Sequence, residues 1–287
     1  MKEKKLPISR RDFLKIIPLS LFGIAGEVVP TMKNIIKFGE MFAEQKVALL
    51  TQEEIDFLSE HPINHGETRK KQIMMTYDEG IRPENVEHLL DVYKKAGAKC
   101  TFFMRGDGLI ESREFIPRLI DEGHELGSHG DSPEHLNLAL FSEVDLIDQF
   151  QKWLSKVYSI VPQYNPTHFR APYGSYNQRV LETAASFGLQ HVLWNVESGG
   201  EVETTMDNVF KNFQLFQNYY DAVGGAIVLS HTHRRFDISQ SEAIVNKWLE
   251  LGYELVTISE GKKESDTWKP YDTIYNTNTK KDMMAME

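Results

Sequence analysis

The amino-acid sequence predicts an α/β fold, specifically a distorted (β/α) barrel of about seven parallel strands. Short apolar runs alternate with helical patterns over most of the chain. Polar and charged residues directly follow several of these runs, at the position where barrels of parallel strands carry their chemistry. The length of 287 residues suits one large α/β domain better than two small ones.

Residues 1–26 carry the pattern of an export signal. Residues 9–15 read Ser-Arg-Arg-Asp-Phe-Leu-Lys, and the apolar stretch 16–26 that follows contains Pro18 and is too short for an ordinary membrane span. The pattern closely resembles the twin-arginine signal, which is read by a receptor. We therefore expect the twin-arginine export machinery as a partner and a periplasmic or extracellular location. Cleavage before Gly26 and retention of the segment as a membrane tether both stay open.

The charge distribution argues against nucleic acid as a partner. Residues 1–26 carry a net charge of +4, which leaves −14 for the rest of a chain whose total is −10. Cys100 is the only cysteine, so neither an intrachain disulfide nor a cysteine-based zinc cluster can form. The oligomeric state does not follow from the sequence.

Residues 27–71 are expected to form a helical adapter ahead of the barrel. Residues 51–54, Thr-Gln-Glu-Glu, have the spacing of a capping box, which predicts a short helix that begins there. His61 and His65 lie in the polar connection that follows, and we expect both on the surface.

The barrel itself is predicted over residues 72–261, and its first strand organises the rest. Residues 72–80 read Gln-Ile-Met-Met-Thr-Tyr-Asp-Glu-Gly, an apolar run that ends in two carboxylates and a glycine. Adjacent side chains on a strand point in opposite directions, so Asp78 and Glu79 can share a site only where the strand opens into a loop. Gly80 permits that opening.

The later elements follow in alternation. Strands are expected at residues 100–104, around Leu126, and at residues 168–171, 192–196, 226–229 and 255–258. Helices are expected at residues 82–96, 111–122, 178–187, 207–220 and 239–251, with a long helix striped by Val144, Ile147, Leu154 and Val157. Residues 262–287 are expected to be a polar C-terminal tail.

Six polar residues fall at the ends of five of the predicted strands and should therefore gather at one rim of the barrel. They are Asp78, Glu79, His129, Arg170, Glu197 and His231.

Four motifs in this order resemble those of the polysaccharide deacetylase family, carbohydrate esterase family four, over residues 72 to 258. They are Thr-Tyr-Asp-Glu-Gly at 76–80, Gly-His-Glu-Leu-Gly-Ser-His at 123–129, Arg-Ala-Pro-Tyr-Gly at 170–174 and Leu-Ser-His at 229–231. The resemblance implies a hydrolase of linear amide C–N bonds, and the signal pattern predicts that it is exported. Its substrate would be an N-acetylated glycan, either peptidoglycan or chitin-like.

The resemblance also implies roles for individual residues. Asp78 would be the general base and His231 the general acid, with Arg170 holding Asp78 ionised. A divalent metal, expected to be zinc, would be bound by Glu79, His129 and His135. The remaining roles concern substrate binding: the backbone N–H of Tyr173 next to Pro172 for the oxyanion, and Leu229 and Trp194 for the acetyl group.

Three departures from the family pattern keep alternatives open. Glu79 replaces an aspartate. His135 follows His129 by six residues rather than four, and we explain the difference by a two-residue insertion within residues 130–134. Asp131, in this segment, is a spare oxygen ligand. The fourth motif keeps only Glu197, which we expect to pair with Arg170. The alternatives are a metal-independent or differently specific amide hydrolase on the same barrel and a non-catalytic glycan-binding relative.

Overall fold

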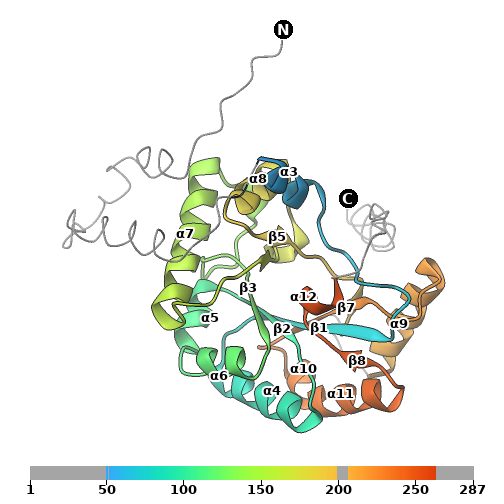
Figure 1. Cartoon of the computed structure of the whole chain (residues 1–287). Helices are drawn as coiled ribbons and strands as arrows, with labels where there is room; N and C mark the ends of the chain where they lie inside the picture. Colours follow the sequence, from blue (N-terminus) through green and yellow to red (C-terminus); the bar gives the residue numbers. More distant parts are fainter. Residues whose placement is uncertain (1–49, 51, 199–205, 263–287) are drawn as a thin grey trace, which may run out of the picture. The chain divides into compact units, whose positions relative to one another are not determined.

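The structure, a computed structural model, describes residue 50 and residues 52–198 and 206–262. The chain divides into two units, Met1–Phe57 and Leu58–Glu287, and the barrel lies in the second (Figure 1). The predicted export signal, most of the predicted adapter and the tail beyond Lys262 lie outside the described residues. Within the described ranges, no helix combines the length and hydropathy needed to cross a bilayer.

All strand pairs in the barrel are parallel, which confirms the predicted fold class. Seven strands follow one another in the order β5-β4-β3-β2-β1-β7-β6, and β8 pairs with the first two residues of β1. The strands are β1 (Gln72–Glu79), β2 (Thr101–Met104), β3 (Glu125–Ser128), β4 (His168–Phe169), β5 (Gln190–His191), β6 (Val196–Glu197), β7 (Ala226–His231) and β8 (Glu254–Leu255).

The strand β1 is central because its residues after Gln72 are all buried and it lies between β2 and β7. Its apolar start, Ile73 to Met75, suits a strand that is covered on both faces. Its register sets Asp78 beside His231 of β7 and Glu79 beside Met104 of β2. The rim that follows is therefore built outward from the end of β1.

The predicted strand at residues 192–196 is wrong in detail, because two shorter strands flank it. The strands β5 and β6 form the two edges of the sheet, and the chain between them passes from one edge to the other. Ile63 pairs with Val192 in this gap: Ile63 N–H donates to His191 O at 2.8 Å, and Leu193 N–H donates to Ile63 O at 2.7 Å. A segment that precedes β1 thus supplies the pairing that a continuous fifth strand would have made.

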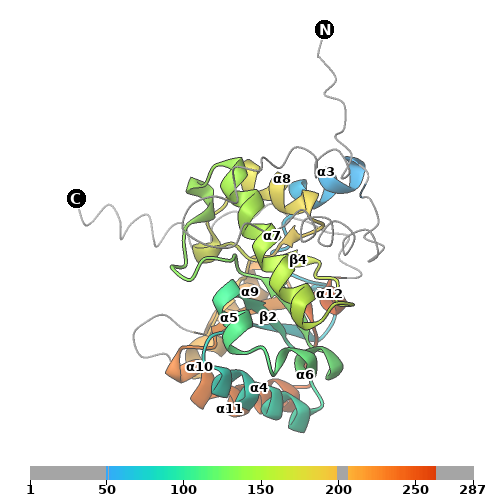
Figure 2. The ribbon, with the colours of Figure 1, turned by 90° about the vertical axis from the view of Figure 1, so that its left-hand side faces the viewer.

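The helices surround the strands (Figures 1 and 2). The predicted helices at 111–122 and 239–251 are shorter than expected, at residues 116–121 and 241–250, and each follows a separate short helix that was not predicted. Pro117 lies near the start of the first of these, where its missing N–H costs nothing, and it would break a helix that ran through it. The bounds are α3 (Gln52–Glu60), α4 (Pro83–Ala96), α5 (Gly106–Glu111), α6 (Ile116–Asp121), η2 (Leu138–Leu140), α7 (Glu143–Ile160), η3 (Pro172–Gly174), α8 (Gln178–Ser186), α9 (Met206–Tyr220), α10 (Arg235–Ser239), α11 (Ser241–Glu250) and α12 (Ile258–Gly261).

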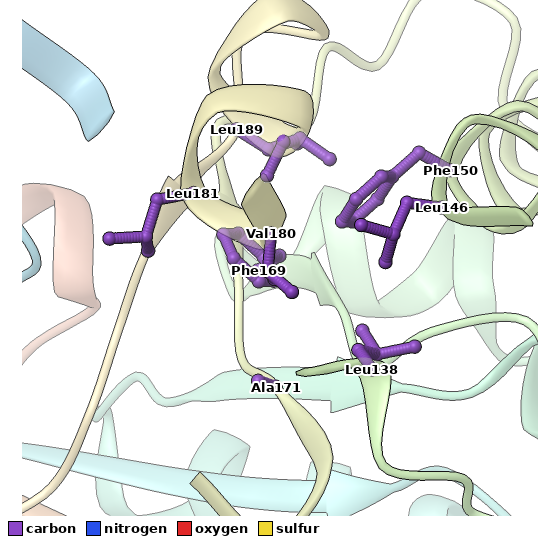
Figure 3. Packing of buried hydrophobic residues seen from close by; sticks show 9 residues of the cluster. Leu138, Leu146, Phe150, Phe169, Ala171, Val180, Leu181 and Leu189 are labelled. Carbon is purple, nitrogen blue, oxygen red and sulfur yellow. The ribbon is translucent and has the colours of Figure 1, made fainter. Parts of the chain in front are cut away.

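Among the described residues, two apolar clusters pack against the strands. The inner cluster comprises Ile63, Met74, Phe103, Val192, Ile227, Val256 and Ile258. The outer cluster lies between α7, α8 and β4, where Phe150 meets Phe169 edge to face at a centroid distance of 5.4 Å (Figure 3). On α7 the buried face includes Leu146 and Phe150, whereas Val144, a predicted member of the apolar stripe, is half exposed. This packing fixes β4 and with it Arg170, the residue that follows.

Candidate active site

The rim predicted from the sequence exists at the carboxyl ends of β1, β3, β4 and β7. Asp78 and His231 are paired positions on neighbouring strands. His129 directly follows β3, and Arg170 directly follows β4. All four side chains are buried, with at most 8% of any residue exposed.

Asp78 is held ionised by Arg170. Arg170 Nη1 donates to Asp78 Oδ1 at 2.8 Å, and neither side chain is open to bulk water. Burial alone would raise the pKa of Asp78, but Arg170, His129 and His231 outweigh it and hold the pKa below its usual range. Because Arg170 takes Oδ1, the other carboxylate oxygen, Oδ2, is left to face His129, at 3.7 Å from Nε2.

Arg170 is itself fixed by a set of acceptors around its guanidinium. Nη1 also donates to Thr76 Oγ1 at 2.7 Å, Nε donates to Val192 O at 3.2 Å and Nη2 to Leu193 O at 3.0 Å. The expected partner Glu197 is not among them; its carboxylate accepts from Trp194 Nε1 at 3.1 Å instead. That expectation is wrong because four of the five guanidinium N–H groups donate to Asp78, to Thr76 and to the chain that crosses between the two sheet edges.

Glu79, His129 and His135 bring three potential metal-binding atoms together, all within 4.8 Å of one another. Glu79 Oε1 lies 3.7 Å from His129 Nε2 and 3.5 Å from His135 Nε2, and the two histidine nitrogens are 2.9 Å apart. Glu79 itself adopts a φ of 82°, so the turn begins one residue before Gly80. This turn is what lets Glu79 and Asp78, adjacent on a strand, share a site.

The chemistry of these donors fits a divalent cation such as zinc. His129 Nδ1 lies 2.9 Å from the carbonyl oxygen of Arg170, so Nδ1 carries the proton and the lone pair on Nε2 is directed at the group. Burial is the main cause that lowers the pKa of His129 and of His135, which keeps both rings neutral and able to coordinate. The longer side chain of Glu79 and the displaced His135 are therefore both compatible with a three-ligand site.

Asp131, the spare ligand, lies outside this group. Its Oδ1 accepts from Lys156 Nζ at 2.5 Å. His135 instead completes the set from a φ of 53°, with its ring 4.5 Å from that of Tyr173.

Asp237 is a site residue that the sequence reasoning missed. Its Oδ2 accepts the N–H of His231 at 2.7 Å and lies 3.6 Å from His231 Nδ1. Its Oδ1 accepts from Ser198 Oγ at 2.5 Å. Within the described residues, His231 Nδ1 is buried without a hydrogen-bond partner. The Asp237 carboxylate is the acidic group that faces this nitrogen. The only sequence signal was an acid six residues after His231, on the short helix α10.

Arg105 and His233 were also missed. Arg105 Nη1 lies 3.6 Å and His233 Nδ1 3.8 Å from Glu79 Oε2. Two basic groups thus face one oxygen of Glu79, while the two histidines of the metal-binding group face the other. The signal for Arg105 was its place directly after β2, the same rim position as the other site residues.

The predicted substrate-binding residues lie around this centre. Tyr173 has a φ of 60° inside η3 and a side chain that is 66% exposed, while Pro172 is buried. Leu229 is buried beside Thr76, and Trp194 packs against the inner apolar cluster with its ring 5.5 Å from the Arg170 guanidinium. Their roles in binding an acetyl group remain predictions.

Two further histidines, His65 and His168, lie outside this centre. His65 was expected on the surface but is buried, because the segment before β1 is part of the barrel, with its Nδ1 2.8 Å from Gly66 O. His168 connects Lys262 to Glu125 at the opposite, amino-terminal end of the strands, with Nδ1 2.5 Å from Glu125 Oε1.

Taken together, the rim offers a buried ionised carboxylate, a histidine on the adjacent strand and a three-ligand group between β1 and β3. This arrangement can activate water, polarise a carbonyl and deliver a proton to a leaving group, the three requirements of amide hydrolysis.

Comparison with known proteins agrees with this chemistry. The family model described as polysaccharide deacetylase matches residues 65–192. The chain is 32% identical over 208 residues to a peptidoglycan-N-acetylglucosamine deacetylase of Bacillus cereus, which covers 67% of this chain and 88% of that protein. It is 31% identical over 192 residues to the Listeria monocytogenes peptidoglycan-N-acetylglucosamine deacetylase PgdA, a match that covers 66% of this chain but only 38% of that longer protein.

A solved structure extends the comparison to the fold. A carbohydrate esterase family four pseudoenzyme from Bacillus anthracis superposes with a TM-score of 0.61 at 25% identity, covering 70% of this chain and 68% of that chain. Sequence, fold and the four motifs therefore agree that this chain belongs to the polysaccharide deacetylase family.

Proposed function

We propose that this protein is a hydrolase that removes N-acetyl groups from an N-acetylated glycan, and that it depends on a divalent metal. The observation that carries the proposal is the pairing of Asp78 with His231 across β1 and β7, directly beside Glu79, His129 and His135. A protein that only bound glycans would not need a buried carboxylate held ionised next to a histidine. The named relatives of this chain act on peptidoglycan N-acetylglucosamine, which supports the substrate class.

In the proposed reaction, Asp78 accepts a proton from the attacking water at Oδ2, since Oδ1 is bound by Arg170. Glu79, His129 and His135 would hold a divalent cation, expected to be zinc, which would supply Lewis acidity at this rim. The water oxygen forms a bond to the carbonyl carbon, and the backbone N–H of Tyr173 donates to the developing oxyanion.

The second half of the reaction belongs to His231. Its ring donates a proton to the amine as the C–N bond breaks, which releases acetate and a free amino sugar. Asp237, bound to the backbone N–H of His231 and facing its Nδ1, orients the ring and stabilises its protonated form. In this proposal Leu229 and Trp194 line the pocket for the acetyl group.

The proposed location is outside the cytoplasm. The Ser-Arg-Arg-Asp-Phe-Leu-Lys pattern of residues 9–15 supports recognition by the twin-arginine machinery. That route carries folded proteins, so the metal would be loaded before export.

A second candidate is a non-catalytic relative, because a family pseudoenzyme shares the fold with this chain at 25% identity over the superposed part. Two measurements separate the possibilities: acetate release from peptidoglycan and from N-acetylglucosamine oligomers, and the metal content of the purified protein. The proposal expects release that a chelator abolishes and zinc restores. Release that a chelator leaves unchanged would indicate a metal-independent hydrolase.

Active-site variants complete the test. We expect Asp78→Asn and His231→Ala each to lower kcat by about 10²- to 10⁴-fold. Their effects should be non-additive in the double variant, because both residues act in one reaction. If the wild-type protein binds N-acetylated glycans but releases no acetate with zinc present, a non-catalytic role replaces the proposal.

A further inference from the structure

The loop that carries His135 needs an external support. It spans residues 130–134, where the sequence alignment places a two-residue insertion. Gly130 has a φ of 81° and His135 a φ of 53°, so the backbone is left-handed at both ends of the loop. A non-glycine residue in the left-handed region persists only where the surrounding structure determines it. The support must come from residues that contact the loop.

Helix α7 provides these contacts through Gln149. Gln149 Oε1 accepts two successive backbone N–H groups of the loop, from Asp131 at 2.9 Å and from Ser132 at 3.0 Å. One side-chain oxygen thus fixes the direction of two adjacent peptide groups, four residues and three residues before His135. No other side chain within the described residues accepts from these two N–H groups.

Lys156 provides a second contact from the same face of α7. It lies seven residues, or two helical turns, after Gln149, and its Nζ donates to Asp131 Oδ1 at 2.5 Å. Asp131 is 9% exposed, so this ion pair is largely withdrawn from water. The pair also fills the space beside Gly106, where an added Cβ would lie 2.0 Å from Asp131 Oδ1. Gly106 N–H in turn donates to Gly130 O at 3.0 Å, which closes the base of the loop.

We propose that Gln149 and the Lys156–Asp131 ion pair are positioning residues that bring His135 into the metal-binding group. They offset the two-residue insertion that sets His135 six rather than four residues after His129. The inference rests on the proposed metal dependence, because His135 is the ligand being positioned. Asp131 acts as the anchor of the loop rather than as a ligand.

The test compares zinc affinity among variants of the full chain, measured by competition with a chromogenic chelator. Gln149→Leu removes the acceptor of both loop N–H groups, and we expect its zinc Kd to rise about 10- to 100-fold, the usual range for residues that orient a ligand. Gln149→Glu keeps an acceptor oxygen and should stay close to wild type. Lys156→Met should weaken zinc binding in the same direction. Lys152→Met is the matched control, because Lys152 lies on the same helix but pairs with Asp148 at 2.7 Å, away from the loop.

A double-mutant cycle separates positioning from general destabilisation. In a His135→Ala background, Gln149→Leu should cause no further loss of zinc affinity, because the ligand that it positions is already gone. An equal loss in both backgrounds would overturn the proposal, as would a wild-type Kd for Gln149→Leu.

A metal-free measurement distinguishes this inference from the proposed function. In protein treated with a chelator, amide hydrogen exchange at Asp131 and Ser132 should be faster in Gln149→Leu than in wild type and unchanged in Lys152→Met. If the wild-type protein binds no zinc, the metal-dependent function fails. Unchanged exchange in Gln149→Leu would instead refute the anchoring of the loop, whatever the protein binds.

Discussion

The buried pair of Asp78 and Arg170 allows a quantitative test of how the proposed base is kept ionised. We expect Arg170→Met to lower the free energy of unfolding by about 3–5 kcal/mol, because it leaves the Asp78 carboxylate buried without its counter-charge. Asp78→Asn should cost a similar amount, since it leaves a fully buried guanidinium unpaired. Two unit charges about 4 Å apart attract by about 4 kcal/mol at an effective dielectric constant of 20.

The double variant, Asp78→Asn with Arg170→Met, should therefore be about 3–4 kcal/mol more stable than the sum of the two single losses would predict. The assay is urea unfolding followed by tryptophan fluorescence at pH 7, with a chelator present so that metal binding does not contribute to stability. The matched control is the exposed pair of Arg69 and Asp221, 3.2 Å apart, where Arg69→Met should cost at most about 1 kcal/mol. Losses that add within about 0.5 kcal/mol would show that the two charges do not depend on each other, and the reasoning would be refuted.

Three further predictions concern the acid, the structural network and export. Asp237→Asn should lower kcat about 10- to 100-fold with little change in KM, because it removes the charge that faces His231 while keeping the side chain's size; an unchanged kcat would exclude this role. Burial would raise the pKa of Glu125, but His168 and Ser259 outweigh it and lower the pKa to about 2, below its value in the unfolded chain. The ionised Glu125 should therefore add roughly 3 kcal/mol to the free energy of unfolding above pH 4.5, and this contribution should be lost as the pH falls toward 2. Unfolding measured from pH 6 to 2 should show this slope in wild type and a flatter one in Glu125→Gln. Replacing both Arg10 and Arg11 with Lys should retain the protein in the cytoplasm, and fractionation that finds it exported as before would contradict the predicted signal.

Several features of the site followed from the sequence by a general rule. Polar residues that directly follow parallel strands must meet at one edge, so the positions of Asp78, His129, Arg170 and His231 along the chain suffice to place them together. The same rule predicts Arg105, which follows β2, but its lack of a matching motif hid it. His135 lies beside Glu79 and His129, where it was predicted, although the sequence also offered Asp131.

Errors arose where the outcome depended on contacts between distant segments. Glu197 was expected to pair with Arg170, but the guanidinium donates instead to Asp78, to Thr76 and to two backbone carbonyls of the chain between β5 and β6. The predicted strand at 192–196 gives way to two edge strands because Ile63, from a segment interpreted as an adapter, pairs with Val192. Neither contact leaves a local pattern in the sequence.

The sequence by itself determined most of the alternation of strands and helices, the motifs and the rim on which the polar residues lie, because these depend on local periodicity and on the direction of parallel strands. The tertiary structure decided which atoms meet: Asp237 rather than Glu197 as a charged partner within the site, and His135 rather than Asp131 beside Glu79 and His129. The physical reason is that loop conformations are set by distant partners. Gln149 and Lys156 lie two turns apart on α7, which begins eight residues after His135, and both bind the loop of residues 130–134. No spacing rule in the sequence predicts these contacts.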